Sequence, residues 1–384
     1  MNEGLLKREY IVFANRDHYN TLGIVRTLGE AGIKPIVVVV TSEPKQATLS
    51  KYVKEKYHVN SPEDGIRLIL SKFATNKEEK SFILTGDDVT VMLLDKHYDE
   101  LKDYFYFYNA GKAGRITEVM HKDYMCALAE KHGFNVPKTW KVKPGEIPYD
   151  IEYPIITKAV NSFGEEWKGI VKICRNEHDL LDAYANVKKS KYILLQKYME
   201  KIDEQSYDGF SINHGNDVFF TVQNNEMFHI PGQYAPYWKN KNVDDEIFIN
   251  KARGFISEIG FEGIFEIEFL VAEDGTLYFL EINLRNTVNG WTSTVAGMPL
   301  ATRWCEAMEN SMINTGVYQK IPEGFTTMAE CFDYDARVRT GLISRSEWMK
   351  QYRQADAKLY RGRNDLLPFL SFMWYKQTKM KRKH

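Results

Sequence analysis

Two glutamates stand on two strand-like segments that one turn folds together, and their spacing is the first chemical signal in this chain. Glu268 and Glu281 lie within residues 264–285, on either side of the pair Asp274–Gly275. An Asp-Gly pair between β-rich runs is typical of a hairpin with a two-residue turn. Such a turn places Glu268 directly opposite Glu281, so the spacing predicts two carboxylates that face each other across the hairpin.

Side chains alternate between the two faces of a strand, which divides the hairpin into a polar face and an apolar face. The polar face is predicted to carry Glu266, Glu268, Glu281, Asn283 and Arg285, together with Leu270, Leu277 and Phe279. The apolar face is predicted to carry Phe265, Ile267, Phe269, Leu280, Ile282 and Leu284. We expect the apolar face to pack against a core and the carboxylates to be partly buried.

Opposed carboxylates on one sheet repel each other and need a positive partner. At a separation of ~5 Å and an effective dielectric constant of ~20, the repulsion is roughly 3 kcal/mol. A cation or a shared proton relieves it, and oxygen ligands without a histidine favour Mg²⁺ or Mn²⁺ over zinc. Arg285 on the same face adds a positive charge that suits a bound phosphate. The alternative is a solvated face whose carboxylates pair with nearby lysines.

The composition limits the class of protein. The chain has 384 residues, enough for two or three domains, and a formal net charge of −1, which gives no electrostatic case for nucleic-acid binding. Its four cysteines show no paired or CxxC spacing, which is typical of a reducing compartment. No signal peptide and no apolar run of ~18 residues is visible. We therefore expect a cytoplasmic protein without a transmembrane segment.

The first hundred residues alternate between strand and helix patterns. Strands are predicted at 10–14, 35–40 and 81–85, and a helix at 21–31. This order indicates a parallel sheet with ligand groups at the strand ends. No G-x-G-x-x-G motif follows the first strand, so we expect no nicotinamide site.

Polar residues follow two of these strands. Arg16, Asp17, His18 and Asn20 follow the first strand, and Asp87 and Asp88 follow the third. The first group either contacts a ligand or caps the next helix through Asp17 or Asn20. We expect the aspartate pair to cap a helix rather than to bind a metal.

Two lysines stand on elements in the middle of the chain. A helix at 117–132 carries Lys122, and a strand at 153–159 carries Lys158. A lysine inside an apolar strand needs an anion, so Lys158 is predicted to bind one. Lys122 has either that role or a place on a helix surface. The loop 161–169 holds two glycines that let backbone N–H groups approach a phosphate, and we expect it to be mobile until an anion binds.

Further elements complete the pattern. Strands are predicted at 170–174 and 192–199, antiparallel strands within 210–227, and helices at 176–185 and 251–259.

The order of these parts resembles the ATP-grasp superfamily over roughly residues 1–330. The parts that carry the resemblance are Lys122, Lys158, the loop 161–169, Gln196-Lys197-Tyr198-Met199, Ile267–Leu270 and Leu280–Arg285. Within that superfamily the chain is similar to the carboxylate-amine ligases related to D-aspartate ligase, on the segments 196–199, 206–209 and 365–370. Leu284 departs from the pattern, because relatives usually have proline there.

The resemblance implies an α/β (α+β) fold of the ATP-grasp type, with an N-terminal parallel-sheet α/β domain and two subdomains that clasp ATP. The expected boundaries are 1–112 for the N-terminal domain, 113–195 for the small subdomain, 196–330 for the large subdomain with the metal hairpin, and 331–384 for a C-terminal extension with a basic tail.

The resemblance also implies a role for each site residue. Lys122 and Lys158 contact the phosphates and adenine of ATP, and Ser162 and Gly164 lie in the loop that closes over the phosphates. Gln196, Lys197, Tyr198 and Met199 form the hinge beside adenine, and Glu204 or Asp203 holds the ribose. Glu268, Glu281 and Asn283 bind Mg²⁺ or Mn²⁺, and Arg285 stabilises an acyl phosphate.

The implied activity is that of an ATP-dependent carboxylate-amine ligase. It joins a small-molecule carboxylate to an amine through an acyl phosphate and releases ADP and phosphate; amino acids and cell-envelope or polysaccharide precursors are the candidate substrates. Two alternatives remain open: an ATP-grasp enzyme with another acceptor, such as a carboxylase or kinase, and a non-catalytic nucleotide-binding protein.

The sequence of the C-terminus allows two interpretations. Residues 366–375 are rich in aromatic residues, and the tail 376–384 carries five Lys or Arg and no acid. The segment either packs on the protein body or makes weak peripheral contact with an anionic membrane. Pro368 makes the segment a poor helix, so we expect the packed arrangement.

Overall fold

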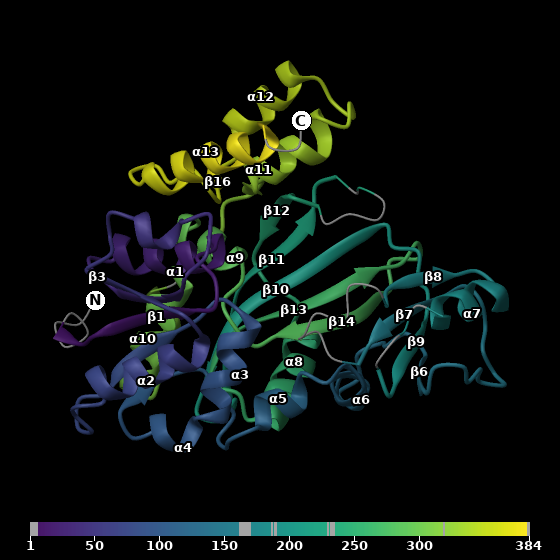
Figure 1. The fold of residues 1–384 in the computed structure, drawn as a ribbon, viewed down its shortest axis with the longest axis horizontal. Coiled ribbons are helices and arrows are strands. Elements are labelled where there is room, and N and C mark those ends of the chain that lie inside the picture. Colours follow the sequence, from purple (N-terminus) through teal and green to yellow (C-terminus); the bar gives the residue numbers. More distant parts are fainter. Residues whose placement is uncertain are drawn as a thin grey trace.

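The computed structural model describes residues 7–160, 170–185, 187, 190–228, 230, 235–317 and 319–381. Three sheets organise this part of the chain (Figure 1). The N-terminal sheet lies at the left, a long central sheet crosses the middle, a small sheet lies at the right, and the C-terminal helices lie at the top. The loop 161–169, with Ser162 and Gly164, lies outside the described residues.

The N-terminal sheet is parallel, as the sequence predicts. Its strand order is β3-β2-β1-β4-β5. The strands are β1 Tyr10–Ala14, β2 Ile36–Val40, β3 Glu55–Val59, β4 Ser81–Leu84 and β5 Phe105–Tyr106. The helices are α1 Tyr19–Glu30, α2 Pro62–Phe73, α3 Asp88–Lys96 and α4 Tyr98–Leu101, with the 3₁₀ turn η2 at Ala47–Leu49. The sequence does not reveal β3, because this edge strand is mostly exposed and lacks the apolar run of a buried parallel strand.

The helix predicted at 117–132 is two helices. They are α5 Arg115–Val119 and α6 Lys122–Lys131. His121 is extended, and the N–H of Lys122 donates to the carbonyl of Val160 rather than to a preceding helical turn. The break places Lys122 at the first residue of α6, beside the end of the strand that carries Lys158.

The small sheet is antiparallel and has the order β6-β9-β7-β8. Its elements are β6 Thr139–Val142, β7 Ile155–Ala159, β8 Lys172–Cys174 and β9 Ile193–Lys197, with α7 at Glu177–Ala185. Lys158 lies on β7 and pairs with Leu194 of β9.

The central sheet has the order β14-β13-β10-β11-β12-β15-β16. Its strands are β10 Asp203–Ile212, β11 Asp217–Glu226, β12 Tyr237–Lys241, β13 Gly263–Val271, β14 Leu277–Asn283, β15 Thr326–Met328 and β16 Ala357–Lys358. The helices of this region are α8 Glu246–Ile259, α9 Asn289–Val295 and α10 Leu300–Asn310, with the 3₁₀ turn η4 at Thr315–Val317. Aromatic rings from β13, β14 and α8 pack together in the core on one face of the sheet, which leaves the other face for polar side chains.

The β13–β14 hairpin has the predicted pairs but not the predicted turn. Glu268 lies opposite Glu281, and Glu266 lies opposite Asn283. The turn has three residues rather than two, because the Ala272 N–H donates to the Thr276 carbonyl across 273–275. A bulge then restores the register near the glutamates.

Because of the bulge, two residues of β14 do not lie on the faces predicted for them. Phe269 pairs with Phe279, so Leu280 is the extra residue of β14. Phe279 is 1% exposed and belongs to the core, whereas Leu280 is half-buried. The predictions for these two residues were therefore wrong by one position.

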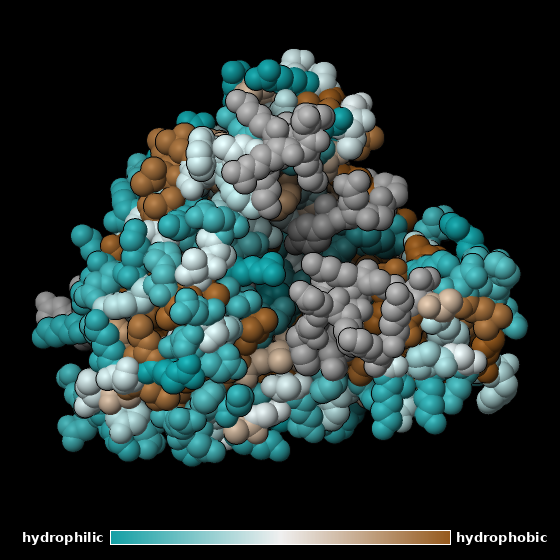
Figure 2. Space-filling model, viewed as in Figure 1, coloured by the Kyte–Doolittle hydropathy of each residue, from teal (hydrophilic) through white to brown (hydrophobic). Residues whose placement is uncertain are grey.

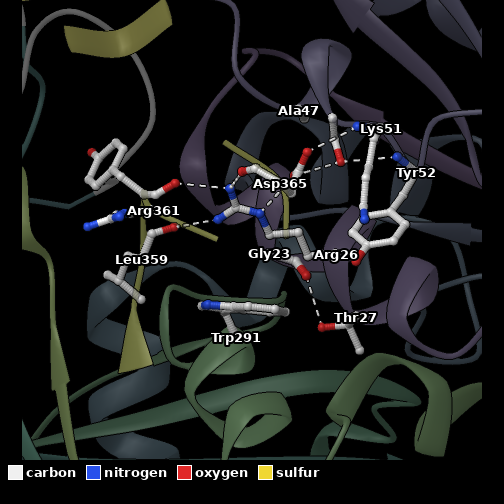
Figure 3. A network of polar contacts seen from close by, with 12 residues as sticks. Gly23, Arg26, Thr27, Ala47, Lys51, Tyr52, Trp291, Leu359, Arg361 and Asp365 are labelled. Atoms are coloured by element: carbon white, nitrogen blue, oxygen red, sulfur yellow. Dashed lines mark hydrogen bonds and ion pairs between the residues drawn. The ribbon is translucent and has the colours of Figure 1, made fainter. Parts of the chain in front are cut away.

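The C-terminal extension folds over the N-terminal domain. Its elements after β15 are α11 Glu330–Asp333, η5 Tyr334–Val338, α12 Arg345–Gln354 and α13 Leu367–Lys381. Arg26 of α1 anchors it: Nε donates to Asp365 Oδ2 at 3.0 Å, and the other guanidinium nitrogens donate to the carbonyls of Leu359, Tyr360 and Asp365 (Figure 3). Because this ion pair is buried and its polar atoms are satisfied, it holds the extension in one position.

The aromatic C-terminal segment forms a helix, contrary to the expectation from Pro368. The proline occupies the second residue of α13, where no intrahelical donor is lost. Phe372 stacks on Tyr360 at 4.5 Å, which confirms packing on the body. Leu367, Leu370 and Trp374 are 56%, 56% and 69% exposed, and hydrophobic surface is visible over α13 at the upper left of Figure 2. No helix in the described part of the chain is long and apolar enough to cross a membrane.

Candidate functional site

Four polar side chains of the hairpin lie together on the face of the central sheet opposite the core. Asn283 Nδ2 donates to Glu266 Oε2 at 3.1 Å and to Glu268 Oε1 at 2.7 Å. Burial raises the pKa of Glu268 well above its usual range, and the Glu266 and Glu281 carboxylates raise it further. The predicted crowding of carboxylates is confirmed, and it leaves Glu268 in need of a proton or a cation.

A second layer of polar residues supports this cluster, and the sequence prediction missed it. Asp208 of β10 lies opposite Glu266 of β13 and is fully buried. Its oxygens accept from Thr287 Oγ1 at 3.0 Å and from Asn224 Nδ2 at 2.7 Å. Burial, followed by the charge of Glu266, raises the pKa of Asp208 well above its usual range. The signal was available in the alternation of Glu204, Ser206 and Asp208 along β10.

Arg285 is held at the edge of the cluster by an aspartate from the N-terminal domain. Its Nε donates to Asp88 Oδ1 at 2.7 Å, and an NH2 group donates to Asn283 Oδ1 at 3.1 Å. Burial opposes the charged form of Arg285, but the Asp88 carboxylate outweighs burial and raises the pKa. Of the predicted capping pair, Asp87 caps α3 through Thr90 N–H, whereas Asp88 pairs with Arg285 instead.

The two predicted lysines come together at the boundary between the small and central sheets. Lys122 Nζ lies 3.2 Å from Glu281 Oε2 and Lys158 Nζ donates to Gln196 Oε1 at 2.7 Å. Burial lowers the pKa of Lys158 to about 8, the charge of Lys122 lowers it further, and Glu281 opposes the shift. Two ammonium groups beside one carboxylate leave an excess of positive charge, which suits an anion such as a phosphate.

The predicted hinge begins with the last two residues of β9 and continues past its end. The N–H of Lys197 donates to the Lys138 carbonyl at 2.8 Å, and the N–H of Tyr198 donates to the Pro154 carbonyl at 3.0 Å. These two amides are therefore engaged within the small sheet. Met199 is the predicted hinge residue that follows them on the way to β10.

The two predicted ribose ligands have different partners. Asp203 accepts from the N–H of Glu226 at 3.0 Å and from Asn225 Nδ2 at 3.1 Å. Glu204 accepts from Lys201 Nζ at 2.6 Å, and burial raises its pKa while Lys201 opposes the shift. Asp203 thus ties β10 to β11, whereas Glu204 faces the carboxylate cluster, and the charges of Glu226 and Glu266 also raise its pKa.

The donor set fits a hard divalent cation. Among the described residues, no group of three or more His, Cys, Asp or Glu side chains is arranged as a metal site. The predicted metal ligands do not form such a group, because they are two carboxylates, Glu268 and Glu281, and the amide of Asn283. The cross-strand carboxylates offer the oxygen ligands that Mg²⁺ prefers. Asn283 Oδ1 now accepts from Arg285, so its amide must turn to contribute.

In the remaining polar group, at the end of β1, the expected helix cap was wrong. The N-cap of α1 is His18, whose ring accepts from the N–H of Asn20, so neither Asp17 nor Asn20 caps the helix. Asp17 is buried, and its carboxylate accepts from the N–H of Ala47 at 2.5 Å. Asp17 therefore orders the chain after β2 instead of facing a ligand.

A protein-family model matches the middle of the chain. Residues 130–310 match the family model described as "Carbamoyl-phosphate synthase L chain, ATP binding domain". The matched residues make up a little less than half of the chain, and over them the chain is similar to that ATP-binding domain. The matched segment begins at the end of α6 and runs to the end of α10, so it includes the small sheet and the carboxylate hairpin but not Lys122.

Solved ATP-grasp structures share the fold across most of the chain. An L-amino acid ligase from Bacillus licheniformis has a TM-score of 0.60 at 13% identity, covering 83% of this chain and 78% of that chain. The biotin carboxylase domain of 2-oxoglutarate carboxylase from Hydrogenobacter thermophilus, solved with MgADP, ADP and bicarbonate, has a TM-score of 0.61 at 20% identity, covering 82% and 73%. At these identities the likeness shows the fold alone.

A curated relative is similar over part of the chain. The small subunit of 2-oxoglutarate carboxylase from Hydrogenobacter thermophilus is 28% identical over 153 residues, which cover 36% of this chain and 31% of that protein. The chain thus matches about a third of the length of this relative, and the activity of the whole relative does not transfer with the match.

Proposed function

We propose that this protein is an ATP- and Mg²⁺-dependent carboxylate-amine ligase that forms an amide bond through an acyl phosphate. The observation that carries the proposal is the meeting of Lys122, Lys158 and Glu281, where fixed positive charge from α6 and β7 reaches a carboxylate of the central sheet. Phosphoryl transfer needs little more than this positioning and charge neutralisation. The ATP-grasp fold supports the same conclusion, since a relative with this fold was solved with MgADP.

Each part of the site has a role in this reaction. Residues 113–195 and 196–330 act as the two subdomains that clasp ATP. Lys122 and Lys158 bind its phosphates, Gln196 to Met199 border adenine, and Glu204 holds the ribose. Ser162 and Gly164 belong to the loop that closes over the phosphates.

The carboxylate hairpin positions the transferred group. Glu268, Glu281 and Asn283 would hold Mg²⁺, which neutralises phosphate charge when bound. Arg285, fixed by Asp88, faces the negative charge that develops as phosphate is transferred. The Asn283 and Asn289 amides keep Glu266 hydrogen-bonded, so that the ligands keep their geometry.

The chemistry has two steps. A carboxylate oxygen of the first substrate attacks the γ-phosphorus, and the bond between that phosphorus and ADP breaks. The amine nitrogen of the second substrate then attacks the acyl carbon and loses a proton. The carbon–oxygen bond breaks, and phosphate leaves with the oxygen that the carboxylate supplied.

The substrate classes are amino acids and cell-envelope or polysaccharide precursors. Similarity to ligases related to D-aspartate ligase on segments 196–199, 206–209 and 365–370 supports this choice, as does the fold shared with an L-amino acid ligase. All four cysteines are free and buried, which supports a reducing, cytoplasmic setting.

A second candidate is an ATP-dependent carboxylase. The 28% identity to a 2-oxoglutarate carboxylase subunit favours it, because that relative is named as a carboxylase. A carboxylase uses ATP with bicarbonate, whereas the ligase uses ATP with a carboxylic acid and an amine.

A product screen separates the two candidates. Purified protein with MgATP is supplied with pairs of amino acids, with amino acids plus nucleotide-sugar or peptidoglycan precursors, and with bicarbonate plus 2-oxo acids. Release of phosphate together with a product whose mass is the sum of the two substrates minus water supports the ligase. Phosphate release that requires bicarbonate, with a product heavier by carbon dioxide, contradicts it.

A further inference from the structure

A cavity of about 370 Å³ lies beside the carboxylate site, between the N-terminal domain and the C-terminal extension. Its walls are mainly aromatic and aliphatic side chains and include Tyr19, Trp238, Val288, Ala329 and Phe332. These residues come from α1, β12, the segment after β14 and α11, and the small sheet contributes none. The cavity is therefore separate from the elements proposed to bind adenine.

The cavity adjoins the reacting groups. Val288 follows Arg285 by three residues on the same segment. Tyr19 lies close enough for the charges of Arg285 and Glu266 to act on the pKa of its hydroxyl, which burial raises. A molecule in this cavity thus has one end near the proposed phosphoryl-transfer site.

The charge balance of the cavity favours an apolar occupant. Asp335 is the acidic residue of its lining. Lys376 Nζ lies 2.5 Å from Asp335 Oδ2, and Arg339 Nε lies 3.0 Å from Oδ1. Two cations already balance this carboxylate, so a charged side chain would lose hydration without gaining an unpaired partner. An aliphatic or aromatic side chain gains by leaving water for these walls.

Arg16 precedes the lining residue Tyr19 by three positions and does not itself line the cavity. Arg16 follows β1 and is exposed, and its guanidinium makes no hydrogen bond or ion pair with any described residue. Burial and the charges of Arg285 and Arg16 lower the pKa of His18, whose ring lies at a tilt of 39° against Tyr19, with 3.7 Å between the ring centroids. A guanidinium without a partner at the carboxyl end of a parallel strand is suited to a carboxylate.

We propose that the amine substrate is an amino acid with an apolar side chain, which occupies this cavity while Arg16 binds its carboxylate. This inference rests on the proposed ligase function and assigns the substrate class of one half of the reaction. The carboxylate of the amine substrate does not react. It therefore needs a cation other than Arg285, which faces the transferred phosphate.

Binding measurements test the proposal without turnover. Calorimetry is run on the full chain with DL-phenylalanine, DL-leucine, DL-aspartate and phenylalaninamide, with and without Mg²⁺ and a nonhydrolysable ATP analogue. We expect phenylalanine and leucine to bind at least tenfold more tightly than aspartate. We expect phenylalaninamide, which lacks the carboxylate, to bind at least tenfold more weakly than phenylalanine.

Three variants locate the binding. Ala336→Phe fills the cavity and should weaken phenylalanine at least tenfold while nucleotide binding is unchanged. Phe332→Ala removes one wall; its 45% exposure makes the change safe for folding, and it should weaken phenylalanine as well. Arg16→Met should remove the difference between phenylalanine and phenylalaninamide. Ile247→Ala on α8, 72% exposed and away from the cavity lining, is the matched control.

The outcomes separate this inference from the function on which it rests. Aspartate binding as tight as phenylalanine, or phenylalanine binding untouched by Ala336→Phe and Phe332→Ala, overturns the apolar assignment and leaves the ligase intact. Loss of nucleotide binding in the wild type with retained, cavity-dependent phenylalanine binding supports the cavity and counts against the ligase.

Discussion

Replacing Lys158 by methionine is expected to change stability and nucleotide binding in opposite directions. Burial, with help from Lys122, lowers the pKa of Lys158 from 10.5 to about 8. At about 1.4 kcal/mol per unit, the charged side chain costs the nucleotide-free fold up to about 3 kcal/mol near neutral pH. Methionine keeps the apolar stem but leaves Gln196 Oε1 without a donor, at a cost of about 1–2 kcal/mol. The net expectation is a gain of about 1–2 kcal/mol in the free energy of unfolding.

The sign of the pH dependence follows from proton linkage. Between the folded pKa of about 8 and the unfolded value of 10.5, the unfolded chain binds more protons at Lys158 than the folded chain does. Wild-type stability therefore rises with pH through this window. The gain from methionine is complete below the folded pKa and is lost as the pH approaches the unfolded one.

Nucleotide binding should move the other way. Without the ammonium group, affinity for MgATP or the rate of turnover should fall at least tenfold, which corresponds to about 1.4 kcal/mol. Urea unfolding near neutral pH and at alkaline pH, with calorimetry of MgATP binding, measures both effects. Lys141→Met on β6 is the matched control, because Lys141 is 41% exposed and forms a surface ion pair with Asp123. Equal or lower stability together with unchanged nucleotide affinity would refute the reasoning.

Four further predictions follow from other parts of the molecule. Glu281→Gln should abolish phosphate release in a folded protein, whereas retained turnover with unchanged metal dependence would remove the metal assignment. Hydrogen exchange at residues 161–169 should slow when MgATP binds, and equal protection with and without it argues against closure. Arg26→Leu leaves Asp365 buried and unpaired, so urea unfolding should show a loss of about 3–5 kcal/mol, and a loss below ~1 kcal/mol would be inconsistent with the anchor. Because Phe372 packs on Tyr360, we expect the protein not to float with anionic liposomes in a flotation assay, even at low salt. Liposome binding that disappears on deletion of residues 366–384 would instead support peripheral membrane contact.

The sequence predicts those parts of the fold that local pattern determines. Buried strands such as β1 and β2 can be recognised in the sequence as apolar runs. The edge strand β3 cannot, because it is mostly exposed. In the hairpin, an unexpected residue in the turn and a bulge at Leu280 compensate each other, so the opposed glutamates were predicted correctly from an incorrect turn.

Long-range pairs account for what the sequence could not predict in the site. Asp88 holds Arg285 although 197 positions separate them, and Lys122 meets Glu281 across 159 positions. Such pairs depend on how the sheets stack, which no local spacing encodes. The cavity has the same origin, because Tyr19 and Phe332 meet only after the C-terminal extension docks on α1.

The central claim is that ATP activates a carboxylate before an amine attacks it, and an isotope measurement tests this most directly. The acid identified by the product screen is labelled with ¹⁸O in both carboxylate oxygens and turned over with MgATP and the amine. The account predicts that one labelled oxygen from each acid appears in the released phosphate, because the acyl carbon–oxygen bond breaks in the second step. Phosphate that carries no label, with amide formed all the same, would contradict the acyl-phosphate mechanism.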